Sequence, residues 1–155
     1  MNPPIPLFLD PCIVNVYINL ATVDKVIIEK LPFTRHVDGA KRWVEDKGEF
    51  VQIAYREDIG HIAFFQLRAG FFRGSHYHKR KEEIFYVVSG KIEAVFMDMD
   101  SQFREEHVLE KGDRIRVKTG CAHIFRGLEE SFVIEYSPQY YDKHDAYIVD
   151  FGVQQ

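Results

Sequence analysis

Two histidines separated by one residue mark the part of the sequence best suited to chemistry. His76 and His78 follow Gly70 and precede Glu83 and Gly90. In a strand, residues two apart point to the same face, so these two imidazoles would project side by side. Imidazoles in that arrangement can share one metal ion, and the pattern therefore predicts a metal site.

Two further residues can complete the ligand set. Glu83 would enter from the start of the next strand, and His123 from a later hairpin that begins at Gly120. Three imidazoles and one carboxylate suit Zn, Fe, Mn, Ni or Co, and the donor types alone do not choose among them. The predicted metal ligands are His76, His78, Glu83 and His123; the alternative is a solvated strand that carries two histidines.

Short runs of β-branched and aromatic residues, separated by glycines, must position these side chains. Runs of this length at intervals of roughly ten residues are typical of an all-β sandwich or barrel. Ser89-Gly90, between two apolar runs, predicts a tight hairpin. Residues 22–30 fit a short helix or an edge strand, and residues 38–46 a short helix or a loop. The predicted strands are residues 13–18, 49–55, 61–67, 84–88, 91–97, 114–117, 121–125 and 132–136.

The length of 155 residues is that of one domain. We expect residues 1–45 to form an N-terminal arm with the first strands, and residues 46–155 to form the barrel. The opening segment is apolar, but it has no basic start and is interrupted by Asp10, Asn15 and Asn19, so it is interpreted as part of the folded protein or as a loosely attached arm.

Composition excludes several classes of protein. A net charge of −4 argues against general attraction to nucleic acid or to an anionic membrane. No run of eighteen apolar residues predicts a transmembrane helix. Cys12 and Cys121 are far apart in the sequence and form no disulfide framework, so a reducing cytoplasm is the expected compartment.

The spacing of the histidines resembles the first motif of the cupin family, G-x5-H-x-H-x(3,4)-E-x6-G. Gly70, His76, His78, Glu83 and Gly90 occupy every position of that motif. The second cupin motif is matched by Gly112, Gly120 and His123, with Lys118 in place of its proline and Gly127 in place of its asparagine. The resemblance implies a double-stranded β-helix, or jelly-roll barrel, with a metal ion inside one mouth.

A narrower resemblance is to the cupins that act on nucleotide sugars. The segment Arg-Gly-Ser-His-Tyr-His-Lys at residues 73–79 is similar to their R-G-x-H-x-H-K segment, and residues 140–151 resemble the Y-Y-D-x-x-D-Y-x-x-D ending of the dTDP-sugar 3,4-ketoisomerases. Those ketoisomerases carry glutamines where Glu82 and Glu83 lie, and they need no metal. The cupin domains of bifunctional UDP-sugar epimerase/reductases bind zinc through the pattern found here. The resemblance therefore implies zinc first, with iron, manganese or nickel as alternatives.

Isomerisation or epimerisation of a keto sugar requires removal of a proton next to a carbonyl. A bound metal ion would polarise the ketone, and an unligated histidine is the natural base. His61 is the candidate if its side chain points inward; without a metal, His76 or His78 would itself be the base. Tyr136 alternates with Glu135 along its strand, and we expect it to face the interior and return the proton.

A nucleotide sugar also needs cations for its pyrophosphate. Arg68 and Arg73 are the candidates near the barrel mouth. Arg114, Arg116 and Lys118 alternate along one strand and are interpreted as a solvated basic stripe. Residues 79–81, Lys-Arg-Lys, are interpreted as an exposed turn.

Three functions stay open at this point. The first is a metal-dependent isomerase or epimerase that acts on a nucleotide-linked keto sugar. The second is an Fe(II)-dependent dioxygenase, because three histidines and a glutamate can hold iron with open positions for oxygen. The third is a cupin that binds a carbohydrate without catalysis.

A homodimer is expected in each case. The resemblance implies it, because the related cupins usually pair through their sheets. In residues 84–88 the side chains on both faces of the strand are apolar. This strand should therefore be buried on both faces, beneath a partner or the N-terminal arm. Residues 13–18 could supply a strand across that interface.

Overall fold

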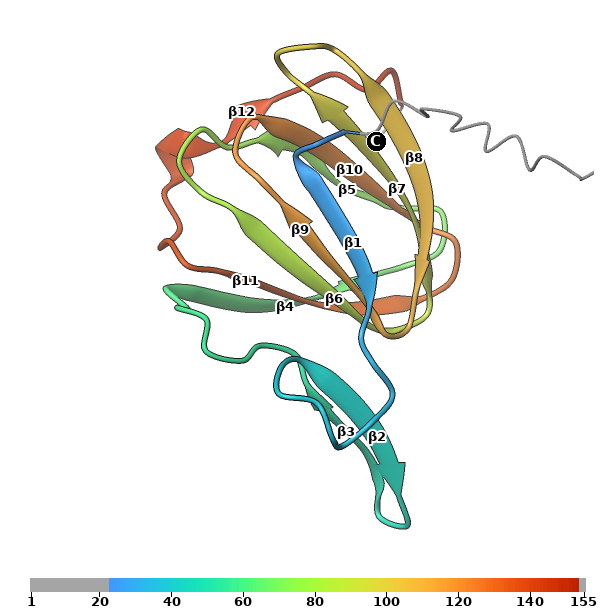
Figure 1. The fold of residues 1–155 in the computed structure, drawn as a ribbon. Coiled ribbons are helices and arrows are strands. Elements are labelled where there is room, and N and C mark those ends of the chain that lie inside the picture. The colour runs from blue at the N-terminus through green and yellow to red at the C-terminus, as the bar shows by residue number, and fades with distance from the viewer. Residues whose placement is uncertain (1–22, 154–155) are drawn as a thin grey trace, which may run out of the picture.

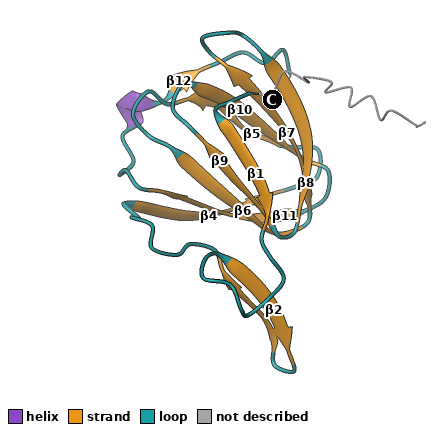
Figure 2. Cartoon of the chain, in the orientation of Figure 1, coloured by secondary structure: helices purple, strands orange, loops and turns teal. Residues whose placement is uncertain are grey.

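Two antiparallel sheets of five strands face each other, and a two-stranded hairpin projects from one end of them (Figures 1 and 2). This computed structural model describes residues 23–153, so Cys12 and the predicted strand at residues 13–18 lie outside the described part. The predicted all-β barrel is confirmed. Within residues 23–153, no helix is long and apolar enough to cross a membrane.

From β4 onward, successive strands alternate between the two sheets, except that β7 and β8 both belong to the second sheet. The first sheet has the order β1 (Val26–Lys30), β9 (Asp113–Val117), β6 (Glu83–Ser89), β11 (Ser131–Ser137) and β4 (His61–Leu67). The second has the order β12 (Tyr147–Ile148), β5 (Phe72–Tyr77), β10 (Cys121–Gly127), β7 (Lys91–Asp98) and β8 (Arg104–Glu110). A single 3-10 turn, η1 (Lys143–Asp145), precedes β12 in the described chain.

The inward faces of the two sheets form one apolar core. Residues two apart share a face, so each strand contributes alternate side chains to the interior. The core of buried residues includes Phe65, Phe85, Val87, Ile92, Phe96, Ile115, Phe125 and Val133. Its aromatic rings meet edge to face, as Phe85 and Phe125 do at 4.9 Å between ring centroids.

The segment before the barrel differs from the prediction in one place. Residues 22–30 contain the edge strand β1, one of the two predicted options. Residues 38–46, predicted as a helix or a loop, instead contain β2 (Lys41–Glu45), which pairs with β3 (Gly48–Gln52). Trp43 stacks on Phe50 across this hairpin at 4.4 Å between centroids, a cross-strand contact that local helical periodicity does not reveal. The predicted boundary between residues 45 and 46 falls in the turn of this hairpin.

The turn at Ser89-Gly90 is a corner and not a hairpin. β6 and β7 flank it but belong to different sheets, so the prediction of a hairpin is wrong. Gly90 has φ 83°, and a side chain there would collide with Ser131 and with the carbonyl of Glu130. The glycine therefore allows a tight crossing between sheets, a requirement that the local sequence shares with a hairpin turn.

Strand β6 is buried on both faces, as predicted. Ile84, Phe85, Tyr86 and Val87 are each at most 2% exposed. The cover comes from within the described chain: Arg42 of the β2–β3 hairpin interacts with the Tyr86 hydroxyl, and burial there raises the pKa of Tyr86. The burial of β6 is therefore complete without a partner chain.

Candidate metal centre

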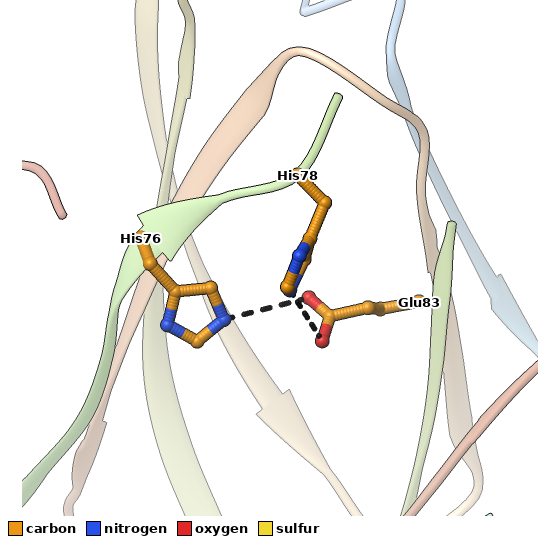
Figure 3. A group of neighbouring side chains, drawn as sticks. All are labelled: His76, His78 and Glu83. Atoms are coloured by element: carbon orange, nitrogen blue, oxygen red, sulfur yellow. Dashed lines mark ion pairs between the residues drawn. The ribbon is translucent and has the colours of Figure 1, made fainter. Parts of the chain in front are cut away.

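The two motif histidines lie side by side at the end of β5. His76 is in the strand and His78 follows its last residue, with 4.9 Å between the ring centroids. Glu83, the first residue of β6, points between them (Figure 3). Its carboxylate lies 3.8 Å from His76 Nε2 and 3.2 Å from His78 Nε2. The ligand atoms of these three residues all lie within 4.8 Å of one another.

His123 brings a third imidazole from the neighbouring strand. It is the register partner of His76 where β10 pairs with β5, and its Nε2 lies 3.5 Å from Glu83 Oε2. The ladder shifts register immediately after His123, at a β-bulge. Bulges re-aim side chains locally, and this one brings two histidines on adjacent strands to one carboxylate.

The backbone opposite the bulge is unusual. Gly74 has φ 103°, and Ser75, which is not a glycine, has φ 64°. A side chain at Gly74 would lie 2.8 Å from the backbone oxygen of His123. The close approach of β5 and β10 therefore requires a glycine at position 74, two residues before His76.

Glu83, and not its neighbour Glu82, faces the imidazoles. Glu83 is 4% exposed, whereas Glu82 accepts a hydrogen bond from Arg116 at 3.0 Å. Successive residues of a strand point to opposite faces, so only one of the two can join the histidines. The structure thus brings together all four side chains that the sequence analysis nominated as ligands.

The hydrogen bonding of His78 fits a metal ligand. Its Nδ1 lies 2.7 Å from the carbonyl oxygen of Asp145, so Nδ1 carries a hydrogen and donates it. The other nitrogen, Nε2, is buried without a hydrogen-bond partner among the described residues and faces the Glu83 carboxylate. An electron pair that faces a carboxylate oxygen needs a cation or a proton between them.

The pKa values of these side chains bear on whether a proton or a metal ion lies between His78 and Glu83. Burial lowers the pKa of His78, but the neighbouring Glu83 carboxylate outweighs it and raises the pKa. Burial lowers the pKa of His123 to about 4, so this imidazole is neutral at neutral pH. Burial opposes ionisation of Glu83, but the nearby histidines and Lys81 hold its pKa well below the ordinary value. The site therefore offers an ionised Glu83 carboxylate and a neutral His123 imidazole, forms that bind divalent metals.

His76, Glu83 and His123 line a pocket of about 80 Å³ that is partly open to solvent, whereas His78 is not among its lining residues. Arg73 also lines the pocket and places its guanidinium 4.8 Å from the ring centroid of Phe65. Arg68, the other predicted cation, is exposed and does not line this pocket. The remaining lining residues include Phe85, Phe125 and Glu135.

Sequence reasoning missed the pocket residue Glu135 and the buried Lys81 beside it. Lys81 was expected in an exposed turn, but it is 4% exposed, and that expectation is wrong. Its Nζ lies 3.0 Å from Glu83 Oε1 and 2.9 Å from Glu135 Oε1. A buried ammonium is tolerated because two carboxylates surround it, and one of these lies 54 residues away.

Tyr136 does not face the pocket, so its predicted role as an interior acid is wrong. Val133 packs in the core and Glu135 lines the pocket, which turns Tyr136 to the outer face of β11. There its hydroxyl donates to Glu57 at 3.2 Å. Glu57 also pairs with Arg114 and Arg116, so these arginines are neutralised by carboxylates and are not a free basic stripe.

His61 points inward, as its proposed role requires. It shares a face of β4 with Phe65 and lies 3.7 Å, Nε2 to Oε1, from Glu135. It is not among the residues that line the pocket, and its ring lies 6.0 Å from that of Tyr141. His61 thus stands at the rim, one side chain removed from the pocket.

Comparisons with known proteins agree with this architecture. The sequence model of the polysaccharide biosynthesis C-terminal domain matches residues 43–146. No curated protein sequence matches the chain. Among solved structures, the dTDP-6-deoxy-D-glucose-3,5-epimerase RmlC from Legionella pneumophila, in complex with dTDP-4-keto-L-rhamnose, is 16% identical with a TM-score of 0.68. The match covers 83% of this chain and 74% of the epimerase.

Two other structures are similar over most of this chain. A 3,4-ketoisomerase from Helicobacter canadensis is 15% identical with a TM-score of 0.64, covering 82% of this chain and 92% of the other. The capsular polysaccharide assembling protein CapF from Staphylococcus aureus is 24% identical with a TM-score of 0.55. That match covers 72% of this chain but 34% of CapF, so the chain spans about a third of that protein's length.

Proposed function

Because the chain belongs to the polysaccharide biosynthesis C-terminal domain family and has an RmlC-like cupin fold, we propose that it is a metal-dependent isomerase or epimerase acting on a nucleotide-linked keto sugar. The observation that carries the proposal is the convergence of three imidazoles on the Glu83 carboxylate, beside a pocket that is partly open to solvent. The sugar chemistry is supported by the similar structures, one of which holds a dTDP-linked keto sugar.

The proposed ligands are His76, His78, Glu83 and His123. A divalent ion at this position, zinc being our first choice, would act as a Lewis acid on the ketone oxygen of the sugar. His76 and His78 then serve as ligands and not as acid or base. Arg73 is placed to contact a phosphate, because its guanidinium borders the pocket and is not held in an ion pair among residues 23–153.

The apolar rings of the pocket have a part in this proposal. Phe65, Phe85 and Phe125 are among the residues that line the pocket. They exclude water from the reacting carbon and strengthen the electrostatic interactions inside the pocket.

Exchange of a carbon-bound hydrogen with solvent is the direct test of this chemistry. Incubated in heavy water with dTDP- and UDP-linked 4-keto sugars, the protein should insert deuterium next to the ketone of at least one of them, detected by mass spectrometry. An anaerobic preparation should do so equally well. If no such sugar exchanges, the proposed reaction is wrong; if activity requires oxygen, the dioxygenase reading replaces it.

A homodimer is the second part of the proposal. On the outer face of β4 and β11, Ile62 is 66% exposed and Phe64 is 61% exposed, and Phe64 stacks on Phe132 at 5.6 Å between centroids. Adjacent exposed apolar side chains of this size are typical of an interface between protein chains. We propose that a second copy covers this surface.

Phe64→Glu should weaken dimerisation at least about tenfold, because it places a charge in the proposed contact. Sedimentation equilibrium at micromolar concentrations measures the change. Val108→Glu is the matched control: Val108 is 60% exposed, but it lies on β8 of the other sheet. A wild-type protein that is monomeric under these conditions contradicts the proposal.

A further inference from the structure

Among the described residues that line the pocket, Glu135 is the one carboxylate that is not a proposed ligand. It lies on β11, two residues after Val133, whose inward side chain is in the apolar core. It lines the same pocket as His76, Glu83 and His123, and its side chain is 20% exposed. An inward carboxylate in a core strand is costly, so its place beside the candidate metal centre requires a reason.

Lys81 orients this carboxylate and supplies its counter-charge. The Lys81 ammonium lies 2.9 Å from Glu135 Oε1 and 3.0 Å from Glu83 Oε1, which places the two carboxylates within about 6 Å of each other. His61 also lies nearest to Oε1, at 3.7 Å. Among residues 23–153, both of these contacts of Glu135 are made through Oε1, which leaves Oε2 for a molecule in the pocket.

We propose that Glu135 is the catalytic residue that moves the proton in the reaction of this pocket, an inference that rests on the proposed function. The Glu135 carboxylate takes the proton from the carbon next to the ketone. The electron pair of that C–H bond becomes the C=C bond of an enolate, and the carbonyl π pair moves to oxygen. Return of a proton to carbon restores the ketone, and its return to the opposite face inverts that carbon. No oxidant or further reactant is required.

The position of Glu135 favours it over His61 as the base. Glu135 lines the pocket, while His61 stands behind it at the rim. A base must come within hydrogen-bond reach of the proton that it removes. His61 instead serves as a positioning residue for the Glu135 carboxylate.

Glu135→Gln tests the proposal with little change in shape, since Gln keeps the side-chain volume and can still accept a hydrogen bond from Lys81. We expect deuterium exchange into the reactive keto sugar to fall at least about 100-fold. Metal content per chain and the dissociation constant for the same sugar, by calorimetry, should stay within a factor of three. Glu135→Asp should recover part of the exchange rate.

Two controls separate this role from a structural one. Glu93→Gln removes a strand carboxylate that pairs with Arg126 on the outer face of β7, and it should leave exchange unchanged. His61→Gln should lower the exchange rate less than Glu135→Gln does.

The outcomes are distinct. Exchange by Glu135→Gln within a factor of three of wild type overturns the inference, as does loss of its metal, which would make Glu135 a support of the metal site. Loss of exchange in His61→Gln but not in Glu135→Gln assigns the base to His61. If wild-type protein binds the sugars but exchanges none, the proposed function fails first, and Glu135 then has no proton to move.

Discussion

Replacing His123 with alanine should lower the metal content of the purified protein from about one ion per chain to a small fraction of that value. His123 is 2% exposed, and its Nε2 faces the Glu83 carboxylate at 3.5 Å. Loss of an outer-shell partner commonly costs 10–100-fold in metal affinity, and loss of a ligand should cost at least about 100-fold. Plasma mass spectrometry of protein purified without chelators measures the content, and deuterium exchange should be lost with the metal.

Matched variants make this prediction specific. His107→Ala removes a histidine of β8 that is 39% exposed in its side chain and pairs with Glu105, so it should keep a full metal content. Glu83→Gln should lose metal, whereas Glu82→Gln, at a residue that pairs with Arg116, should not. Full occupancy in His123→Ala would show that the ligand assignment is wrong.

The second large effect is on stability. Asp145→Ala should lower the free energy of unfolding by about 3 kcal/mol, because the buried Asp145 carboxylate accepts hydrogen bonds from the backbone amides of Lys79, Arg80 and Lys81 at 3.0–3.1 Å. Each buried amide left without a partner costs about 1–3 kcal/mol. Urea unfolding followed by circular dichroism measures the loss.

A neighbouring aspartate provides the control. Asp142 pairs with Arg80 at the surface, and Asp142→Ala should cost less than about 1 kcal/mol. Asp145→Asn keeps one acceptor oxygen and should fall between the two. Equal stability of Asp145→Ala and wild type would mean that these amides find other partners at no cost.

The same contact predicts a pH dependence. Burial alone would raise the pKa of Asp145, but the three amide hydrogen bonds and His78 lower it below the ordinary value. The stability that this carboxylate contributes is therefore present above the pKa of an unfolded aspartate, about 3.9, and is lost as the pH falls through the lower folded pKa. Asp145→Ala should lack this part of the acid-induced loss of stability.

Asp145 also connects stability to the site. The three amides belong to the loop that joins His78 to Glu83, and the carbonyl oxygen of Asp145 holds His78 Nδ1. The turn η1 thus fixes the loop between two proposed ligands and the orientation of one imidazole. We expect Asp145→Ala to lower metal affinity along with stability.

The sequence predicted the structure best where the two-residue alternation of a strand occurs together with a glycine. The strand predicted at residues 61–67 is β4 with the same bounds, and the four nominated ligands converge. Residues two apart in a strand share a face, so the sequence predicts that His76 and His78 point in the same direction. Strand β8, Arg-Glu-Glu-His-Val-Leu-Glu, went unpredicted because an edge strand exposed to solvent carries few apolar residues.

The errors arose where long-range contacts decide orientation. Alternation separates Glu135 from Tyr136 but does not say which of them faces inward. The usual preference for an inward aromatic side chain failed because Lys81, distant in sequence, provides the buried counter-charge for Glu135. The hydroxyl of Tyr136 donates a hydrogen bond to Glu57 on the opposite face of β11. Neither contact has a local signal in the sequence.

The central claim of this account is that His76, His78, Glu83 and His123 bind one divalent metal ion. The most direct test is the metal content of untagged wild-type protein, measured by plasma mass spectrometry after purification without chelators. The account predicts about one equivalent of zinc per chain, with nickel or manganese as acceptable substitutes. Iron would favour the dioxygenase, and no metal, even after reconstitution, would contradict the account and return His76 and His78 to the role of acid and base.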